Sequence, residues 1–260
     1  MKYSYHNHTP LCKHSTGSME DFVLAAIKGG YDVFGFSDHC PHTFKYNDFI
    51  GSSRMTADEL SYYVKSIRAL REKYGNKIDI RIGLETEYLP YHHEKNMQLF
   101  RSAGVEYLIL GQHILGGNDD SYSFINSFAP TDYNEVLRTY TNQVIDGMRT
   151  GDFCYLAHPD VLRYQGDDDF YRQESDRLIK EAMRLCIPLE VNMYGLRDGR
   201  HYPNPLFWER VGRLGAKVVI GRDAHSTERV DPTEEYAAAH AFVKKYGLNV
   251  LDEFYVTVSL

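Results

Sequence analysis

The sequence has little cysteine and no long apolar run. Its 260 residues include four cysteines, none in a Cys-x-x-Cys pair: Cys12, Cys40, Cys154 and Cys186. The first residues, MKYSYHNH, lack the apolar core of a signal peptide, and no later run approaches membrane-spanning length. We therefore expect reduced thiols in a soluble, cytoplasmic protein with no membrane partner.

An excess of basic residues is also missing. The formal net charge is -7, which argues against a nucleic-acid partner but leaves open a small phosphorylated ligand held by local positive charge. No low-complexity segment, linker rich in proline and glycine, or short repeat divides the chain. With 43% hydrophobic and 25% charged residues, we expect one globular domain over residues 1–260. The oligomeric state stays open.

Short apolar runs alternate with longer helical patterns. Mostly unbroken hydrophobicity predicts strands that are covered on both faces, as in a parallel sheet. Seven runs have this character: 2–8, 32–39, 78–88, 105–113, 153–160, 187–194 and 216–225.

Helical patterns fill the gaps between these runs. Thr56 and Glu59 form a capping box ahead of an apolar stripe that ends near Gly75. Alternating strands and helices predict right-handed βα units, and seven strands favour a closed or nearly closed barrel. An open doubly wound sheet remains the alternative. The expected helices are 18–30, 56–75, 92–103, 132–150, 172–186, 204–214 and 232–247.

Nearly every apolar run ends in a side chain that can bind a metal ion. His6 and His8 would share one face of the first strand, although a solvated strand end explains this pair equally well. Alone, His113 is as easily a core imidazole, and Glu85 as easily a salt-bridge partner. The carboxyl ends of parallel barrel strands meet on one face, where buried charges and imidazoles would stay unpaired without a cation. The whole set therefore predicts a metal cluster: His6, His8, Asp38, His39, Glu85, Glu87, His113, His158, Asp160, Asp223 and His225.

The ordered motifs resemble those of the PHP (polymerase and histidinol phosphatase) family. The resemblance spans residues 6 to about 226, and its LGQH, EVN and GR context is most similar to the histidinol-phosphate phosphatases. It implies a distorted (β/α)7 barrel and removal of phosphate from histidinol phosphate during histidine biosynthesis. The motifs are His6-x-His8, His14, SDH at 37–39, Glu85, His113, AHPD at 157–160 and RDAH at 222–225.

The same resemblance implies three divalent ions. Imidazoles and carboxylates without a thiolate suit zinc, manganese or iron. Glu85 would bridge the first and second ions. By motif position, the first ion would be held by His6, His8, Glu85 and Asp223, the second by Glu85, His113 and His158, and the third by His14, His39 and His225.

The remaining roles follow from hydrolysis of a phosphate monoester by a hydroxide that bridges two ions. Asp160, Asp38 or a metal-bound water would protonate the leaving alkoxide. Arg197 and Arg163 follow strands at the metal face, where a guanidinium can fork onto phosphate oxygens. Further candidates for substrate binding are His42 and Glu87. Glu190 and Asn192 share a strand face, and both an anchor for a ligand imidazole and an ordinary buried polar pair remain possible interpretations.

Three other functions are compatible with parts of this pattern. A PHP-type phosphoesterase acting on nucleotides or other small phosphate esters would have the same metal ligands. A noncatalytic accessory metal-binding module is disfavoured because all nine ligand positions are filled. An amidohydrolase-like barrel would often use a carboxylated lysine, and no strand end here presents a lysine at a ligand position.

Overall fold

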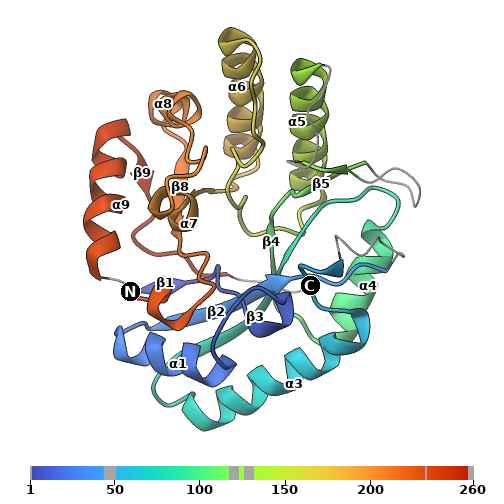
Figure 1. The fold of residues 1–260 in the computed structure, drawn as a ribbon, viewed down its shortest axis with the longest axis vertical. Coiled ribbons are helices and arrows are strands. Elements are labelled where there is room, and N and C mark those ends of the chain that lie inside the picture. The colour runs from blue at the N-terminus through green and yellow to red at the C-terminus, as the bar shows by residue number, and fades with distance from the viewer. Residues whose placement is uncertain (1, 44–50, 117–122, 126–131, 232, 257–260) are drawn as a thin grey trace.

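Parallel strands curl into a barrel, and helices cover its outside (Figure 1). The computed structural model describes residues 2–43, 51–116, 123–125, 132–231 and 233–256. Two parallel sheets form the barrel wall, with the strand orders β1-β2-β3-β4 and β7-β8-β9. The strands are β1 (Tyr3–Ser4), β2 (Val33–His39), β3 (Asp79–Thr86), β4 (Tyr107–Leu110), β7 (Leu189–Asn192), β8 (Lys217–Gly221) and β9 (Asn249–Val250).

Isolated parallel bridges join the two sheets on both sides. Leu156 pairs with Leu110 on β4 and with Leu189 on β7, and Asn7 pairs with Ala224 just beyond β8. The circle of seven parallel segments expected from the sequence is therefore confirmed as β1 to β4, the segment at Leu156, β7 and β8, and the open doubly wound alternative is wrong. Strand β9 pairs with β8 in addition. The strand predicted at 153–160 is shorter than expected. Bridges form at Leu156, backbone hydrogen bonds to β4 run from Cys154 to Ala157, and the chain turns at His158, where φ is 26°.

The helices follow the expected alternation. Both capping boxes at the N-termini of α1 and α3 form, the second from Thr56 and Glu59. Helix α3 packs on β3, and α5 packs on β4. The long helices are α1 (Met19–Lys28), α3 (Ala57–Tyr74), α4 (His93–Ala103), α5 (Tyr133–Thr150), α6 (Asp168–Arg184), α8 (Pro205–Leu214) and α9 (Thr233–Tyr246).

Several short elements were not predicted. Helix α7 (Met193–Arg197) begins directly after β7, and β5 (Ile114–Leu115) pairs antiparallel with β6 (Ser123–Phe124). Two single 3-10 turns, η1 and η2, follow the strand ends that carry the candidate ligands. The turns cover Pro10–Cys12 and Thr227–Arg229. Residue 232, where the last predicted helix was to begin, lies outside the described residues.

Tyr107 fills the inside of the barrel. Its hydroxyl donates hydrogen bonds to the carbonyl oxygens of Tyr5 (2.8 Å) and Phe36 (2.9 Å). A Cβ at Gly35 would lie 2.2 Å from the Tyr107 hydroxyl oxygen, and one at Gly83 would lie 2.2 Å from its ring, so the two glycines make the space for this ring. A larger apolar core lies between the strands and the surrounding helices.

No helix in the part of the chain that the structure describes is both long and apolar enough to cross a membrane.

Candidate metal centre

His6 and His8 flank the bridge that closes the barrel. The amide of His8 donates to the carbonyl oxygen of Ala224 (3.0 Å), which fixes the extended backbone at this point. Because side chains alternate along an extended segment, both imidazoles point to one side and Asn7 points to the other. Asn7 donates to the carbonyl oxygen of Gly35 (2.8 Å), and both histidines are fully buried. The two imidazoles therefore enter the same space, as their spacing predicts.

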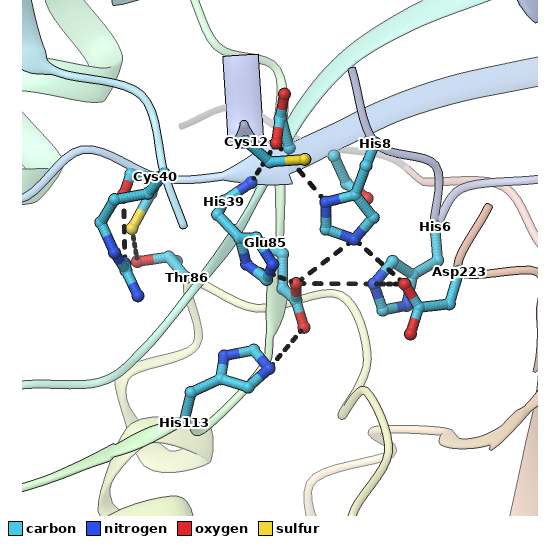
Figure 2. Close-up of polar contacts among 12 residues, drawn as sticks. His6, His8, Cys12, His39, Cys40, Glu85, Thr86, His113 and Asp223 are labelled. Carbon is cyan, nitrogen blue, oxygen red and sulfur yellow. Dashed lines mark hydrogen bonds and ion pairs between the residues drawn. The ribbon is translucent and has the colours of Figure 1, made fainter. Parts of the chain in front are cut away.

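Glu85, on β3, lies at the centre of the candidate ligands (Figure 2). Its Oε1 is 2.7 Å from His158 Nε2 and 3.5 Å from His113 Nε2. Its Oε2 is 3.0 Å from His39 Nδ1 and 3.6 Å from the Nε2 atoms of both His6 and His8. Five imidazoles from four strand ends therefore surround one carboxylate.

The imidazoles around Glu85 explain why its carboxyl group is charged. Burial alone would raise the pKa of its carboxyl, but the neighbouring imidazoles of His113, His39 and His6 outweigh burial and hold the pKa well below its usual range. The buried carboxylate therefore stays ionised and needs positive charge nearby.

Asp223 supplies the second central carboxylate. It follows β8 with a positive φ of 50°, a conformation that L-residues adopt rarely. Its Oδ1 lies 3.1 Å from His8 Nε2, 3.5 Å from His6 Nε2 and 3.3 Å from His225 Nδ1. The strained backbone aims the carboxylate at the same space that the first two histidines enter.

A second group of imidazoles lies at the outer edge of the cluster. His14 Nε2 and His225 Nε2 face each other at 3.0 Å, and the His8 and His225 rings stack with centroids 4.0 Å apart. Burial, together with the nearby His8, lowers the pKa of His225 to about 3. Cys12, which sequence reasoning treated only as a reduced thiol, places its sulfur within 4.8 Å of ligand atoms of His14 and His225.

The ligand atoms at the centre have no hydrogen-bond partner. Within the described residues, this holds for His6 Nε2, His8 Nε2, Glu85 Oε2 and Asp223 Oδ1, all of them buried. Unpaired buried polar atoms are costly, and these four face one another across 3.1–3.6 Å. A metal cation would satisfy all four, so the residues present fit a metal site.

Ligand atoms within 4.8 Å of one another define several three-residue groups. The first matches part of the expected first site, the next two combine residues that were assigned to separate ions, and the last adds Cys12 to two residues of the expected third site. The groups are His6–His8–Asp223, His6–Glu85–His158, His8–His39–His225 and Cys12–His14–His225.

A pocket of about 470 Å³ opens over this cluster. Arg163, predicted to contact substrate, lies in its wall. Sequence reasoning missed Arg54, Arg200, His201, Tyr194 and Tyr202. Only Arg200 had a signal, because it lies in the same MYGLRDGR segment as the predicted Arg197. The wall consists of His14, His39, Ser53, Arg54, Glu85, His113, Phe124, His158, Val161, Arg163, Tyr194, Arg200, His201, Tyr202, Asp223 and His225.

The other predicted substrate contacts lie outside the described pocket wall. Arg197 packs over the ring of Tyr194 and pairs with Asp198 at 2.8 Å. His42 Nε2 lies 2.8 Å from Glu87 Oε2, and Glu87 also contacts His113 Nδ1 at 3.2 Å. Arg197, His42 and Glu87 therefore contact other side chains of the protein beside or behind the cluster.

The two predicted proton donors also lie away from the described wall. Asp38 accepts from the amides of His39 (2.8 Å) and Thr9 (3.1 Å), and its Oδ1 is 3.4 Å from His8 Nδ1. Asp160 accepts from the Trp208 indole (3.0 Å) and from the amide of Asn204. Burial raises the pKa of Asp160 to about 6. Each carboxylate has a visible role in holding the chain around the site.

Fold and site together define a class of protein: a parallel α/β barrel that gathers imidazoles and carboxylates for metal ions beneath a pocket at the carboxyl ends of its strands. The chain belongs to the PHP domain family, whose model matches residues 4–194.

Relatives and solved structures agree with this membership. The chain is 27% identical over 228 residues to a Deinococcus radiodurans protein named "Probable histidinol-phosphatase", and the match covers 86% of each chain. It is 24% identical over 269 residues to the histidinol-phosphatase of Lactococcus lactis, covering 97% of this chain and 94% of the relative. The crystal structure of a Lactococcus lactis histidinol phosphate phosphatase, complexed with zinc, L-histidinol and phosphate, matches with a TM-score of 0.71 and 21% identity over 96% of this chain and 95% of that one. The last likeness supports the barrel fold.

Proposed function

We propose that this chain is a metal-dependent phosphomonoesterase that hydrolyses L-histidinol phosphate to L-histidinol and phosphate. The observation that carries the proposal is the set of four buried, unpaired ligand atoms of His6, His8, Glu85 and Asp223 beneath an open pocket. The names of the relatives support this choice of substrate. We further propose that residues 1–260 act as one PHP-type domain in the cytoplasm, in histidine biosynthesis.

Nine side chains would hold three divalent ions of zinc, manganese or iron. When bound, such ions supply positive charge to phosphoryl oxygens and a water of lowered pKa. Glu85 is the bridging candidate because its two oxygens face different imidazoles. The proposed ligands are His6, His8, His14, His39, Glu85, His113, His158, Asp223 and His225.

Arginines in the pocket wall would bind the phosphate group. Arg163 and Arg200 lie on the wall, and guanidinium groups pair with phosphate oxygens in a forked geometry. Arg200 also donates to the hydroxyl of Tyr194 (2.6 Å), which limits its range of positions. Arg54 contributes less net charge, because it is paired with the buried carboxylate of Glu87 at 3.0 Å. The local charge of the wall thus suits a phosphate dianion although the whole chain is acidic.

Aromatic side chains on the same wall would receive the organic part of the substrate. Tyr194, Tyr202 and His201 line the pocket beside the arginines. Flat rings offer stacking surfaces to the imidazole of histidinol. Asp38 and Asp160 are assigned to holding the loops that carry His8 and His158, because their described contacts lie behind the pocket.

The test is phosphate release by protein that was purified without chelator and assayed for metal content. We expect turnover of histidinol phosphate that disappears with chelator and returns with zinc or manganese. Arg163→Ala and Arg200→Ala should lower kcat/KM while metal content stays constant, and Arg149→Ala on the outer face of α5 is the matched control. A metal-replete protein that releases no phosphate would overturn the proposal. Preference for nucleoside monophosphates over histidinol phosphate would transfer it to the nucleotide alternative.

A further inference from the structure

Strand β7 provides none of the proposed ligands, yet its side chains contact three of them. Glu190 is fully buried, and its Oε1 lies 2.7 Å from His6 Nδ1. Its Oε2 accepts from the backbone amide of His158 (3.0 Å) and from the side-chain amide of Asn192 (3.0 Å). One carboxylate therefore links ligands from opposite parts of the barrel wall.

We infer that Glu190 is a positioning residue that selects the metal-binding tautomer of His6. By accepting a hydrogen bond from Nδ1–H, the carboxylate keeps the proton on Nδ1 and leaves the Nε2 lone pair directed at Glu85 and Asp223, which lie 3.6 and 3.5 Å away. Carboxylates that accept from ligand imidazoles also raise their basicity. This inference rests on the proposed metal centre.

The three contacts require an acceptor at both oxygens of Glu190. A glutamine here has one oxygen and one amino group. If its oxygen faces His6, the amino group meets two donors, the amide of His158 and the side chain of Asn192. If it is flipped, the amino group faces His6 Nδ1 and favours the tautomer with the proton on Nε2. Either orientation disturbs a ligand.

Asn192 extends the same arrangement to a third ligand. Its amino group donates to Glu190 Oε2 and to Asp223 Oδ2, each at 3.0 Å. Its Oδ1 accepts from the amide of Gly195 (2.9 Å) and caps α7. The two roles are separable, because an aspartate here would keep the cap but would face two carboxylates without a donor.

The arrangement predicts which ions depend on it. Glu190 and Asn192 contact His6, His158 and Asp223, but no described contact links either of them to His14 or His225. A merely structural polar pair would weaken folding without distinguishing between ions. A positioning role should weaken binding of the inner ions, which are the first and second ions assigned to His6, Asp223 and His158. It should spare the outer ion, which is the third ion assigned to His14 and His225.

The experiment compares Glu190→Gln, Asn192→Asp and the control Glu174→Gln, a buried carboxylate that pairs with Arg177 on α6. Zinc affinity is measured by competition with a chelator, in the absence of substrate. We expect about 10- to 100-fold weaker binding of the inner zinc ions in the first two variants, an unchanged outer ion, and wild-type binding in the control. NMR of the imidazole nitrogens in the zinc-loaded protein should show the His6 proton on Nδ1 in the wild type.

Two results would overturn the inference: wild-type zinc affinity in both Glu190→Gln and Asn192→Asp, or equal weakening of every ion. Folding of each variant is checked by thermal unfolding, and Asn192→Asp keeps the test decisive should Glu190→Gln fail to fold. Because zinc binding is measured without substrate, failure here is distinct from failure of the phosphatase proposal. A wild type that binds no zinc would instead remove the metal centre itself.

Discussion

Replacing Gly111 with alanine should push the central carboxylate out of place. Gly111 follows β4, and its amide donates to the carbonyl oxygen of Thr86 (3.1 Å). A Cβ at this position would lie 2.1 Å from Glu85 Oε1 and 2.6 Å from its Cδ. The backbone of Gly111 does not require a positive φ, so alanine meets no conformational penalty there. The effect of Gly111→Ala is therefore purely steric.

The size of the effect follows from these distances. Non-bonded heavy atoms prefer about 3.5 Å or more, so the 2.1 Å contact is short by about 1.4 Å. Glu85 must then move, which disturbs the 2.7 Å contact between its Oε1 and His158 Nε2. A displacement of about 1 Å in a catalytic group costs on the order of 100-fold in rate. Overpacking of the interior adds about 1–3 kcal/mol of destabilisation.

Three measurements on Gly111→Ala test this reasoning: phosphate release, metal content and thermal unfolding. The matched control is Gly83→Ala on the strand that carries Glu85, whose Cβ would lie 2.2 Å from the ring of Tyr107 and has no Glu85 atom among its three nearest neighbours. We expect both variants to lose stability, but only Gly111→Ala to lose about 100-fold in kcat per folded molecule. Wild-type kcat and metal content in folded Gly111→Ala would refute the central placement of Glu85.

Three further predictions concern stability. Tyr107→Phe should lower the free energy of unfolding by about 1–3 kcal/mol in chemical denaturation, because it leaves the carbonyl oxygens of Tyr5 and Phe36 without this buried donor. An unchanged free energy of unfolding would contradict the role of the hydroxyl. Glu87→Ala should lower the free energy of unfolding by about 3–5 kcal/mol, because it removes the carboxylate that pairs with the buried guanidinium of Arg54. A loss below about 1 kcal/mol would argue against that ion pair. Removing metal with a chelator should lower the midpoint of thermal unfolding, and zinc at about 100 times its Kd should restore about 2.7 kcal/mol of stability for each ion. A midpoint that does not change with zinc would exclude a metal site in the folded protein.

The barrel could be predicted because its strands are apolar on both faces and are separated by helical patterns. The strand predicted at 153–160 is shorter than expected: bridges form at Leu156, and backbone hydrogen bonds to β4 run from Cys154 to Ala157. The chain here turns through a positive φ at His158, and the backbone amide of His158 is held by Glu190. That contact joins distant segments and leaves no periodic trace in the sequence.

The candidate ligands could be predicted because they recur at strand ends, but their partners could not. Arg54 has no motif, and it reaches the pocket because residues 51–56 return over the end of β2, where it donates to the carbonyl oxygen of Cys40 (3.2 Å). Asp38 and Glu87 sit at strand ends like the ligands, so sequence position alone does not separate the two groups. The hydrogen-bond partners of each carboxylate make this distinction.

Those partners explain why an acidic chain can build a site for an anion. Asp38 faces His8 Nδ1, Glu87 faces His113 Nδ1, and Glu190 faces His6 Nδ1, each from behind the cluster. Each of these carboxylates orients one imidazole, and its negative charge lies away from the pocket that would receive phosphate. Arg163 and Arg200 lie in the pocket wall. The local charge that a phosphate group meets therefore depends on which side of each imidazole the carboxylate occupies. The net charge of the sequence gives no information about this arrangement.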